Sequence, residues 1–123
     1  MPMKINVFLI ALLLALMLPI TGCEDSNDYD HTSPAGKGSL VVDNETGTDI
    51  DLFLNGILQV KVPDDAERYM DLDPGVYRMV LDEHNDYRSY SADVDILESR
   101  LTVVKIQTSA VYAYGYSVSI YFQ

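Results

Sequence analysis

The sequence predicts an all-β protein, a small antiparallel β-sandwich of seven to eight strands. Residues 39–123 form short runs of alternating apolar and polar residues, separated by turn residues at roughly 8–12-residue spacing, as is typical of sandwiches. No window keeps the 3.6-residue period of an amphipathic helix over three turns. The length of 123 residues allows one domain, and the 85 residues from Ser39 onward are enough for one modest core.

The chain begins with an export signal, which we place at residues 1–22. A single basic residue, Lys4, precedes an apolar run of 14 residues from Val7 to Ile20. A membrane-spanning helix needs about 20 residues, so this run has the length of a signal-peptide core instead. We therefore expect the mature protein to begin at Cys23.

The residues that end this segment, Ile20-Thr21-Gly22-Cys23, resemble the bacterial lipobox, in which an aliphatic residue and two small residues precede a cysteine. The resemblance implies cleavage between Gly22 and Cys23, a diacylglyceryl group on the Cys23 sulfur, and an acyl chain such as palmitate on the new N-terminus. Two or more chains give stable membrane anchoring. Lipidation also explains the lone cysteine, because an exposed unpaired thiol is unusual in an oxidising envelope.

Residues 23–38 are predicted to be a flexible acidic tether. They are rich in Asp, Asn, Ser, Pro and Gly, and they include four acids before the first basic residue, Lys37. A flexible segment of 16 residues has a root-mean-square reach of about 20–24 Å, which holds a domain just off a membrane. His31 is expected to be a solvated residue of this tether. Acids directly after the cysteine, here Glu24 and Asp25, resemble sorting signals that differ between bacterial groups. The choice between inner and outer membrane therefore stays open.

The first half of the sandwich contains a strong hairpin signal. Ile50, Leu52 and Leu54 fall on one face of a strand, and Asn55-Gly56 follows, a pair that tolerates the positive φ angles of a tight hairpin turn. The next strand ends at Pro63, and the one after it ends at a second turn. The strands expected in this half cover residues 39–43, 49–54, 57–62 and 68–72.

The second half follows the turn Asp73-Pro74-Gly75 and contains a polar turn at residues 82–86. Its last run is the longest and places Tyr112, Tyr114, Tyr116 and further apolar residues on one face. The strands expected in this half cover residues 76–81, 87–96, 101–106 and 110–122.

The stretch from Gly38 to Gln107 resembles the PEGA-type module, a small Ig-like, prealbumin-like β-sandwich found on bacterial envelope proteins. The residues that carry the resemblance are Gly38-Ser-Leu-Val-Val42, Ile50-Asp-Leu-Phe-Leu-Asn-Gly56 and Met70-Asp-Leu-Asp-Pro-Gly-Val-Tyr77. Asn44-Glu-Thr-Gly47 stands at the turn where the family has its Pro-Glu-Gly-Ala quartet. The resemblance implies a PEGA-like domain over residues 39–123, in which Tyr77 enters the core, and an attachment or interaction module without catalytic residues.

The charge balance excludes several classes of function. Lys and Arg number 8 against 19 Asp and Glu, a net charge of −11, and removal of Lys4 with the signal peptide makes it −12. Nucleic-acid binding depends on Lys and Arg against phosphates, so we exclude it. A single cysteine excludes an intrachain disulfide framework and a cysteine-rich zinc site.

Neither an active site nor a specific metal site is predicted. His84 is expected to be a solvated turn residue, since no nucleophile elbow accompanies it. Two acidic clusters offer oxygen ligands of the kind that Ca²⁺ prefers, but neither has the spacing of a calcium-binding loop. They consist of Asp82, Glu83, Asn85 and Asp86, and of Asp43, Asn44, Glu45, Asp49 and Asp51. We expect no enzyme activity, no cofactor and at most a weak calcium site.

The terminal tyrosines remain as a possible ligand face. Exposed, Tyr112, Tyr114 and Tyr116 would stack on sugar rings or a partner; buried, they belong to the core, which the apolar residues after them favour. The sequence thus predicts an envelope lipoprotein, bound to membrane lipid through acylated Cys23, that displays a non-catalytic interaction module. The alternatives are a glycan or cell-wall binding module that uses these tyrosines, and an acidic partner of a basic envelope protein.

Overall fold

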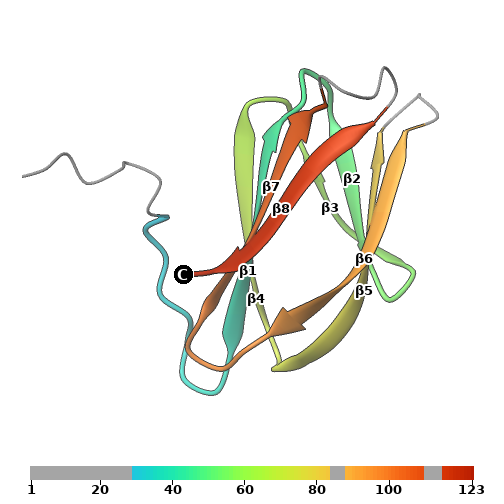
Figure 1. Ribbon diagram of the computed structural model, residues 1–123. Coiled ribbons are helices and arrows are strands. Elements are labelled where there is room, and N and C mark those ends of the chain that lie inside the picture. Colours follow the sequence, from blue (N-terminus) through green and yellow to red (C-terminus); the bar gives the residue numbers. More distant parts are fainter. Residues whose placement is uncertain (1–28, 84–87, 110–114) are drawn as a thin grey trace, which may run out of the picture.

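The computed structural model describes residues 29–83, 88–109 and 115–123, which form two packed β-sheets (Figure 1). Sheet A has the strand order β4-β1-β7-β8, and sheet B has the order β3-β2-β5-β6. The strands are β1 (Gly38–Glu45), β2 (Ile50–Leu54), β3 (Ile57–Val62), β4 (Ala66–Leu72), β5 (Gly75–Glu83), β6 (Ser89–Ile96), β7 (Leu101–Thr108) and β8 (Tyr116–Phe122). The predicted small all-β sandwich of seven to eight strands is therefore confirmed.

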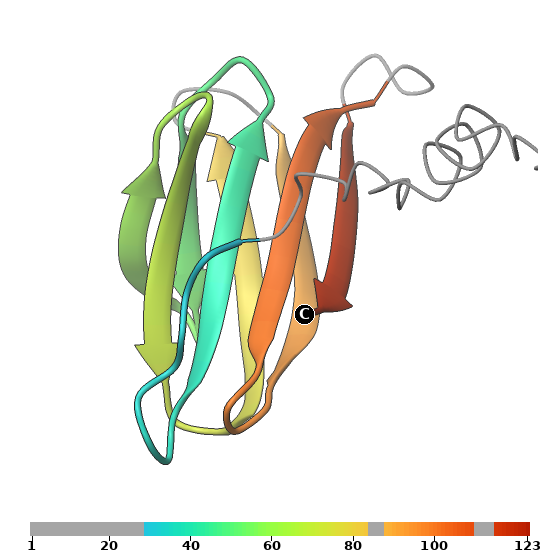
Figure 2. The same cartoon turned by 90° about the vertical axis from the view of Figure 1, so that its left-hand side faces the viewer.

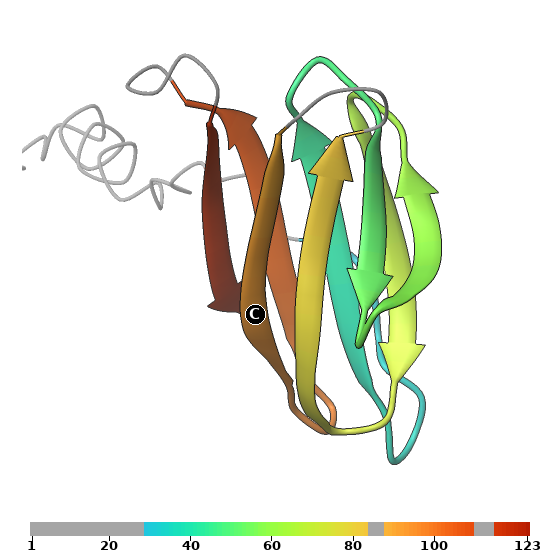
Figure 3. The same cartoon turned by 90° about the vertical axis from the view of Figure 1, so that its right-hand side faces the viewer.

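One pair of neighbouring strands departs from the antiparallel expectation. The two central strands of sheet A, β1 and β7, run parallel, with Ser39 opposite Leu101 and Glu45 opposite Gln107. The reason lies in the path of the chain, which enters β7 from β6 in sheet B at the same end of the sandwich where β1 begins (Figure 3). The five other strand pairs are antiparallel.

The hairpin predicted at Asn55-Gly56 joins β2 to β3. Both residues have positive φ, 50° and 80°, as a tight hairpin turn requires. The turn is also tied to β5, because the Asn55 amide donates to the Arg78 carbonyl at 2.9 Å and the Asn55 side-chain oxygen accepts from the Arg78 amide at 2.9 Å. Local turn chemistry and a neighbouring strand therefore fix the register together.

The main core lies between the two sheets. Alternate residues of facing strands form this core, as the period-2 pattern predicted. Tyr77 packs against the rim of the core, and its hydroxyl donates to the Asp73 carbonyl at 2.7 Å. Its fully buried members are Leu40, Val42, Ile50, Leu52, Leu54, Val62, Met79, Leu81, Val94, Ile96, Val104 and Ile106. The sandwich thus has one main core between its sheets, as the chain length allowed.

The central strands of sheet A are buried on both faces. Leu40 and Val42 of β1 point into the main core, whereas Val41 points to the outside of the sheet and is equally inaccessible. In β7, Val104 faces the core and Val103 faces outward, and both are fully buried. Something must therefore cover the outer face of sheet A.

A buried asparagine closes the sandwich where β1 leaves sheet A. The Asn44 side-chain nitrogen donates to the carbonyls of Thr48, Val62 and Pro63, at 2.7, 3.0 and 3.2 Å. Its oxygen accepts from the amide and the hydroxyl of Thr46, at 3.0 and 2.7 Å. This side chain therefore links the β1–β2 turn to the end of β3.

Replacing Asn44 with alanine should lower the free energy of unfolding. The change leaves buried carbonyls without a donor, so we expect a loss of about 3 kcal/mol in urea denaturation. The exposed Gln59, whose amide bonds only to the nearby Ile57 carbonyl, provides a matched control. Gln59→Ala should change stability by no more than about 0.5 kcal/mol. Equal effects of the two substitutions would contradict this role for Asn44.

Candidate functional site

Residues 29–37, which we call the strap, cross the outer face of sheet A (Figure 2). Tyr29 is only 8% exposed and packs against Val41, Leu101 and Val103, with Tyr69 of β4 beside this outer cluster. The strap thus covers the apolar outer face of the two central strands. A flexible tether therefore does not describe residues 29–37, and residues 23–28 lie outside the described residues.

Tyr29 is held at both its hydroxyl and its backbone. The hydroxyl donates to the Asp43 carboxylate of β1 at 2.5 Å. The Gln123 side chain, just beyond β8, accepts from the Tyr29 amide at 3.1 Å and donates to the Tyr29 carbonyl at 2.9 Å. Burial and the bond to Asp43 raise the pKa of the Tyr29 hydroxyl, so it stays protonated as the donor.

His31 connects the strap to β4. Its Nε2 lies 2.8 Å from an Asp71 carboxylate oxygen, and its ring lies against the Tyr69 ring with 4.9 Å between centroids. The Ser39 hydroxyl donates to the same Asp71 oxygen at 2.6 Å. These two hydrogen bonds hold the pKa of Asp71 below its ordinary value. His31 is therefore a structural contact rather than the solvated residue that the sequence suggested.

The far end of the strap is fastened near the start of β1. The Lys37 ammonium lies 2.6 Å from the Asp73 carboxylate, and the Lys37 carbonyl accepts from the Ser99 amide at 2.9 Å. Gly38 follows at a point of close approach, where an added Cβ would lie 2.3 Å from the Leu97 carbonyl oxygen. Only glycine fits here, where β1 begins beside the connection from β6 to β7.

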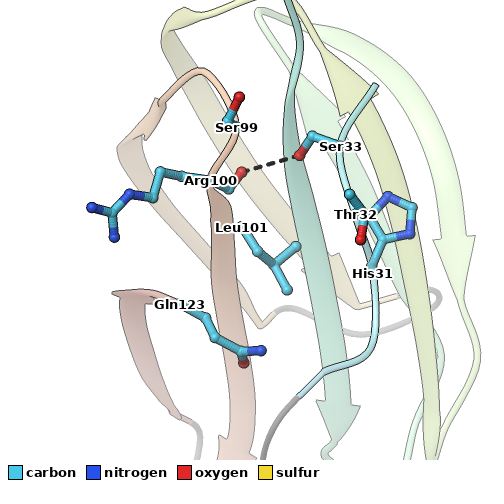
Figure 4. Close-up of a pocket in the computed structure, with 7 residues that line it drawn as sticks. All are labelled: His31, Thr32, Ser33, Ser99, Arg100, Leu101 and Gln123. Carbon is cyan, nitrogen blue, oxygen red and sulfur yellow. Dashed lines mark hydrogen bonds between the residues drawn. The ribbon is translucent and has the colours of Figure 1, made fainter. Parts of the chain in front are cut away.

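A small polar pocket of about 260 Å³ opens between the strap and the start of β7 (Figure 4). The Ser33 hydroxyl donates across it to the Arg100 carbonyl at 3.4 Å, while the Arg100 guanidinium extends away from it. The lining residues are His31, Thr32, Ser33, Ser99, Arg100, Leu101 and Gln123. Typical ligand pockets measure about 300–1,000 Å³, so this one lies just below that range.

The side chains of the pocket are not arranged for nucleophilic catalysis. Its histidine bonds to Asp71 and not to a serine hydroxyl, and Ser33 shares its hydrogen bond with the Ser39 hydroxyl at 2.7 Å. An activated serine needs a base within hydrogen-bond reach. The pocket is therefore best understood as a seam between strap and sandwich.

Glu83 forms a buried ion pair at the opposite end of the sandwich. It is 4% exposed, and the Arg88 guanidinium donates to its two oxygens at 2.6 and 2.9 Å. The Tyr116 hydroxyl also donates to Glu83, at 2.9 Å, and the Arg88 guanidinium lies over the Tyr116 ring. Burial alone would raise the pKa of Glu83, but bonds from Arg88, Thr48 and Tyr116 outweigh it and hold that pKa below its ordinary value.

This ion pair corrects the expectation of a polar turn that begins at residue 82, because Glu83 belongs to β5 and is buried. The strand β5 extends to Glu83, and Arg88 returns to meet it at the start of β6. His84, Asn85 and Asp86 lie outside the described residues. Arg88, five residues after Glu83, carried the missing signal, because a buried carboxylate needs an opposite charge or hydrogen-bond donors as partners.

The second acidic cluster is dispersed by the fold. Asp43 lies under the strap, Asn44 is buried among backbone carbonyls, and Asp49 accepts from the Asp64 amide at 3.2 Å. Over residues 29–83, 88–109 and 115–123 no group of three His, Cys, Asp or Glu side chains could hold a metal ion.

Of the three tyrosines predicted to form a ligand face, only Tyr116 lies among the described residues. Tyr112 and Tyr114 lie outside the described residues, and Tyr116 is half-buried against the core with its hydroxyl on Glu83. Burial and the bond to Glu83 raise the pKa of Tyr116. The exposed aromatic and aliphatic side chains of β8 lie further along the strand, at Ile120, Tyr121 and Phe122.

Comparisons with known proteins support the fold. No family model and no curated protein matches the sequence. The C-terminal domain of AlgF from P. aeruginosa has a similar structure, with a TM-score of 0.57 and 14% identity, over 72% of this chain and 99% of that one. The N-terminal domain of AlgF gives a TM-score of 0.50 and 12% identity over 74% and 98%. At these identities the likeness concerns the β-sandwich alone.

No helix among the described residues is long and apolar enough to cross a membrane. The described residues comprise the sandwich and the strap. Cys23 and Gly22, the residues predicted for lipidation and cleavage, lie outside them. Their role rests on the sequence motif.

Removal of the Tyr29 hydroxyl should loosen the strap. In Tyr29→Phe the buried Asp43 carboxylate loses its donor, so we expect the free energy of unfolding to fall by about 1–2 kcal/mol. Hydrogen exchange should rise at residues 29–37. Tyr90→Phe, which removes a hydroxyl from a half-buried tyrosine of β6, is the matched control and should leave both quantities unchanged. Unchanged exchange in Tyr29→Phe would show that apolar packing alone holds the strap.

Neutralising Glu83 should remove part of the acid sensitivity of the protein. Glu83→Gln breaks a buried ion pair, and we expect a loss of about 3 kcal/mol at pH 7. Because the folded-state pKa of Glu83 lies below its ordinary value of 4.5, this stabilisation is present above pH 4.5 and is lost as pH falls through the folded pKa. Urea denaturation of both proteins should therefore show their difference narrowing below pH 4.5. A constant difference down to pH 3 would contradict the linkage.

Proposed function

We propose that this chain is a bacterial envelope lipoprotein that is anchored through acylated Cys23 and displays a non-catalytic β-sandwich for interaction with other molecules. The observation that carries the proposal is the sequence Ile20-Thr21-Gly22-Cys23 after a short apolar segment with a basic start. Acyl chains on Cys23 would bind membrane lipid with an affinity of roughly 0.8 kcal/mol per buried methylene.

Because the strap is docked, the linker between the proposed anchor and the sandwich is short. Tyr29 is fixed on sheet A, so only residues 24–28 separate it from Cys23. Even fully extended, this stretch spans about 20 Å. For the predicted flexible tether of residues 23–38, about 20 Å would be only the average reach, and the maximum would be longer. The sandwich would therefore stay close to the membrane, with the outer face of sheet A connected to it.

The surface of the sandwich supports an interaction role over catalysis. The histidine of the strap pocket bonds to a carboxylate, and the ion pair of Glu83 and Arg88 is closed by Tyr116. Exposed apolar side chains gather on β8, at Ile120, Tyr121 and Phe122. A glycan-binding role through Tyr112, Tyr114 and Tyr116 is the weaker alternative, since Tyr116 turns its hydroxyl inward to Glu83.

Intact mass and membrane fractionation would test the anchor. The wild-type chain should sediment with membranes and have the mass of residues 23–123 plus a diacylglyceryl and an acyl group. Cys23→Ser should lose both properties. A double variant, Cys23→Ser with Ser26→Cys, keeps one thiol but moves it out of the motif, and it should behave as Cys23→Ser does. Soluble, unlipidated wild-type protein would overturn the proposal.

A further inference from the structure

The β8 edge of sheet A differs from the other three sheet edges in its charge. Over the described residues nothing pairs with its free side, and none of its seven residues, Tyr116–Phe122, is charged. The other edge strands all carry charged residues, which discourage pairing with another chain. These are Lys61 on β3, Glu67, Arg68 and Asp71 on β4, and Asp93 and Asp95 on β6.

The β8 edge also exposes apolar surface. Ile120 is 36% exposed and Phe122 is 48% exposed, on the same side of the strand as Tyr116 and Val118, which pack against the core. The neighbouring edge strand of sheet B, β6, therefore leaves Ile120 and Phe122 uncovered. Uncharged, unpaired and partly apolar strands are ready templates for strand addition.

The hydrogen bonds between β7 and β8 show which backbone groups of β8 point to the open edge. Gln123 exchanges two hydrogen bonds with Leu101 of β7, at 2.9 and 3.4 Å, and the Gly115 carbonyl accepts from the Ser109 amide at 3.2 Å. Antiparallel strands alternate between bonded and non-bonded positions, so the odd-numbered residues of β8 face β7. The N–H and C=O groups that point to the open edge are those of Tyr116, Val118, Ile120 and Phe122.

We propose that β8 pairs antiparallel with β8 of a second copy of this chain, about a two-fold axis at Ser119. This register overlaps the whole strand and places Tyr116 opposite Phe122 and Val118 opposite Ile120. Both pairs are apolar, and all four residues are the ones with free backbone groups. Ser119 then faces its own counterpart as a non-hydrogen-bonded pair, with about 4.5 Å between the Cα atoms.

Charge favours a second copy at this edge. Two chains of net charge −11 repel each other, and the uncharged β8 is the sheet edge where two copies approach with the least repulsion. A basic partner would instead favour the edges of β4 or β6, where acidic side chains are exposed. The self-complementary register is the further requirement that a symmetric dimer imposes on its interface.

The symmetry also suits a membrane anchor. A two-fold axis perpendicular to sheet A keeps the outer faces of both copies on one side. Both straps, which lie on those faces, then lead toward the same membrane. This last step rests on the proposed lipid anchor, whereas the pairing of β8 strands does not.

Disulfide trapping in the full chain would test the register. Ser119→Cys should form a disulfide-linked dimer under mild oxidation, because the paired Cα atoms fall within the distance that a disulfide spans. Ser117→Cys is the matched control: Ser117 would face Tyr121, about 14 Å from Ser117 of the other copy, so it should remain monomeric. Both variants are made with and without Cys23→Ala, so that a failed anchor and a failed dimer are told apart.

A charged residue in β8 should dissociate the dimer. Adding Ile120→Lys to Ser119→Cys places two like charges at the interface, and the cross-link should disappear while circular dichroism shows a folded sandwich. Gln59→Cys on the charged β3 edge should not cross-link. Equal cross-linking of Ser119→Cys, Ser117→Cys and Gln59→Cys would overturn the proposal. So would a disulfide from Ser119→Cys to a different protein, or a monomer in sedimentation analysis of the unmodified chain.

Discussion

The structure depends on the burial of β1 and β7 on both faces. A strand at the centre of a sheet can expose one face to water only if that face is polar, and here Val41 and Val103 are apolar outward-facing residues of neighbouring strands. The second sheet covers the inner face and the strap covers the outer one. The strap is therefore part of the hydrophobic architecture, and its hydrogen bonds to Asp43, Asp71 and Gln123 fix where on sheet A it lies.

Polar groups that this packing buries are each provided with partners. Asn44 satisfies carbonyls from two separate segments, and Glu83 is enclosed by Arg88 and Tyr116. Within the described residues no buried side-chain nitrogen or oxygen lacks a hydrogen bond. Buried polar atoms without partners would cost about 1–3 kcal/mol each, a large part of the stability of a domain this small. Both polar clusters lie at the end of the sandwich where β1, β3 and β5 finish, and Thr48 is a partner of each.

The strand pattern could be predicted because it depends on local rules. The alternation at Ile50, Leu52 and Leu54 and the turn at Asn55-Gly56 directly encode a strand and its hairpin. The docking of residues 29–37 depends on contacts between residues up to 94 positions apart, such as Tyr29 with Gln123, which composition does not reveal. One signal was present: the continuous apolar run Leu40-Val41-Val42 lacks the polar alternation of a half-exposed strand. The same limit of local rules applies to Glu83, whose burial depends on Arg88.

The strap lies between the proposed lipid anchor and the β8 edge. The proposed anchor at Cys23 would act on the sandwich through Tyr29, which lies over β1 and β7 and bonds to Gln123 just beyond β8. The same glutamine exchanges backbone hydrogen bonds with Leu101, which sets the phase of β8 and therefore which of its backbone groups face the open edge. Release of the strap would remove the Gln123 side-chain contacts and uncover the valines of the outer cluster. With the proposed anchor at Cys23, the docked strap would limit how far the β8 edge lies from the membrane.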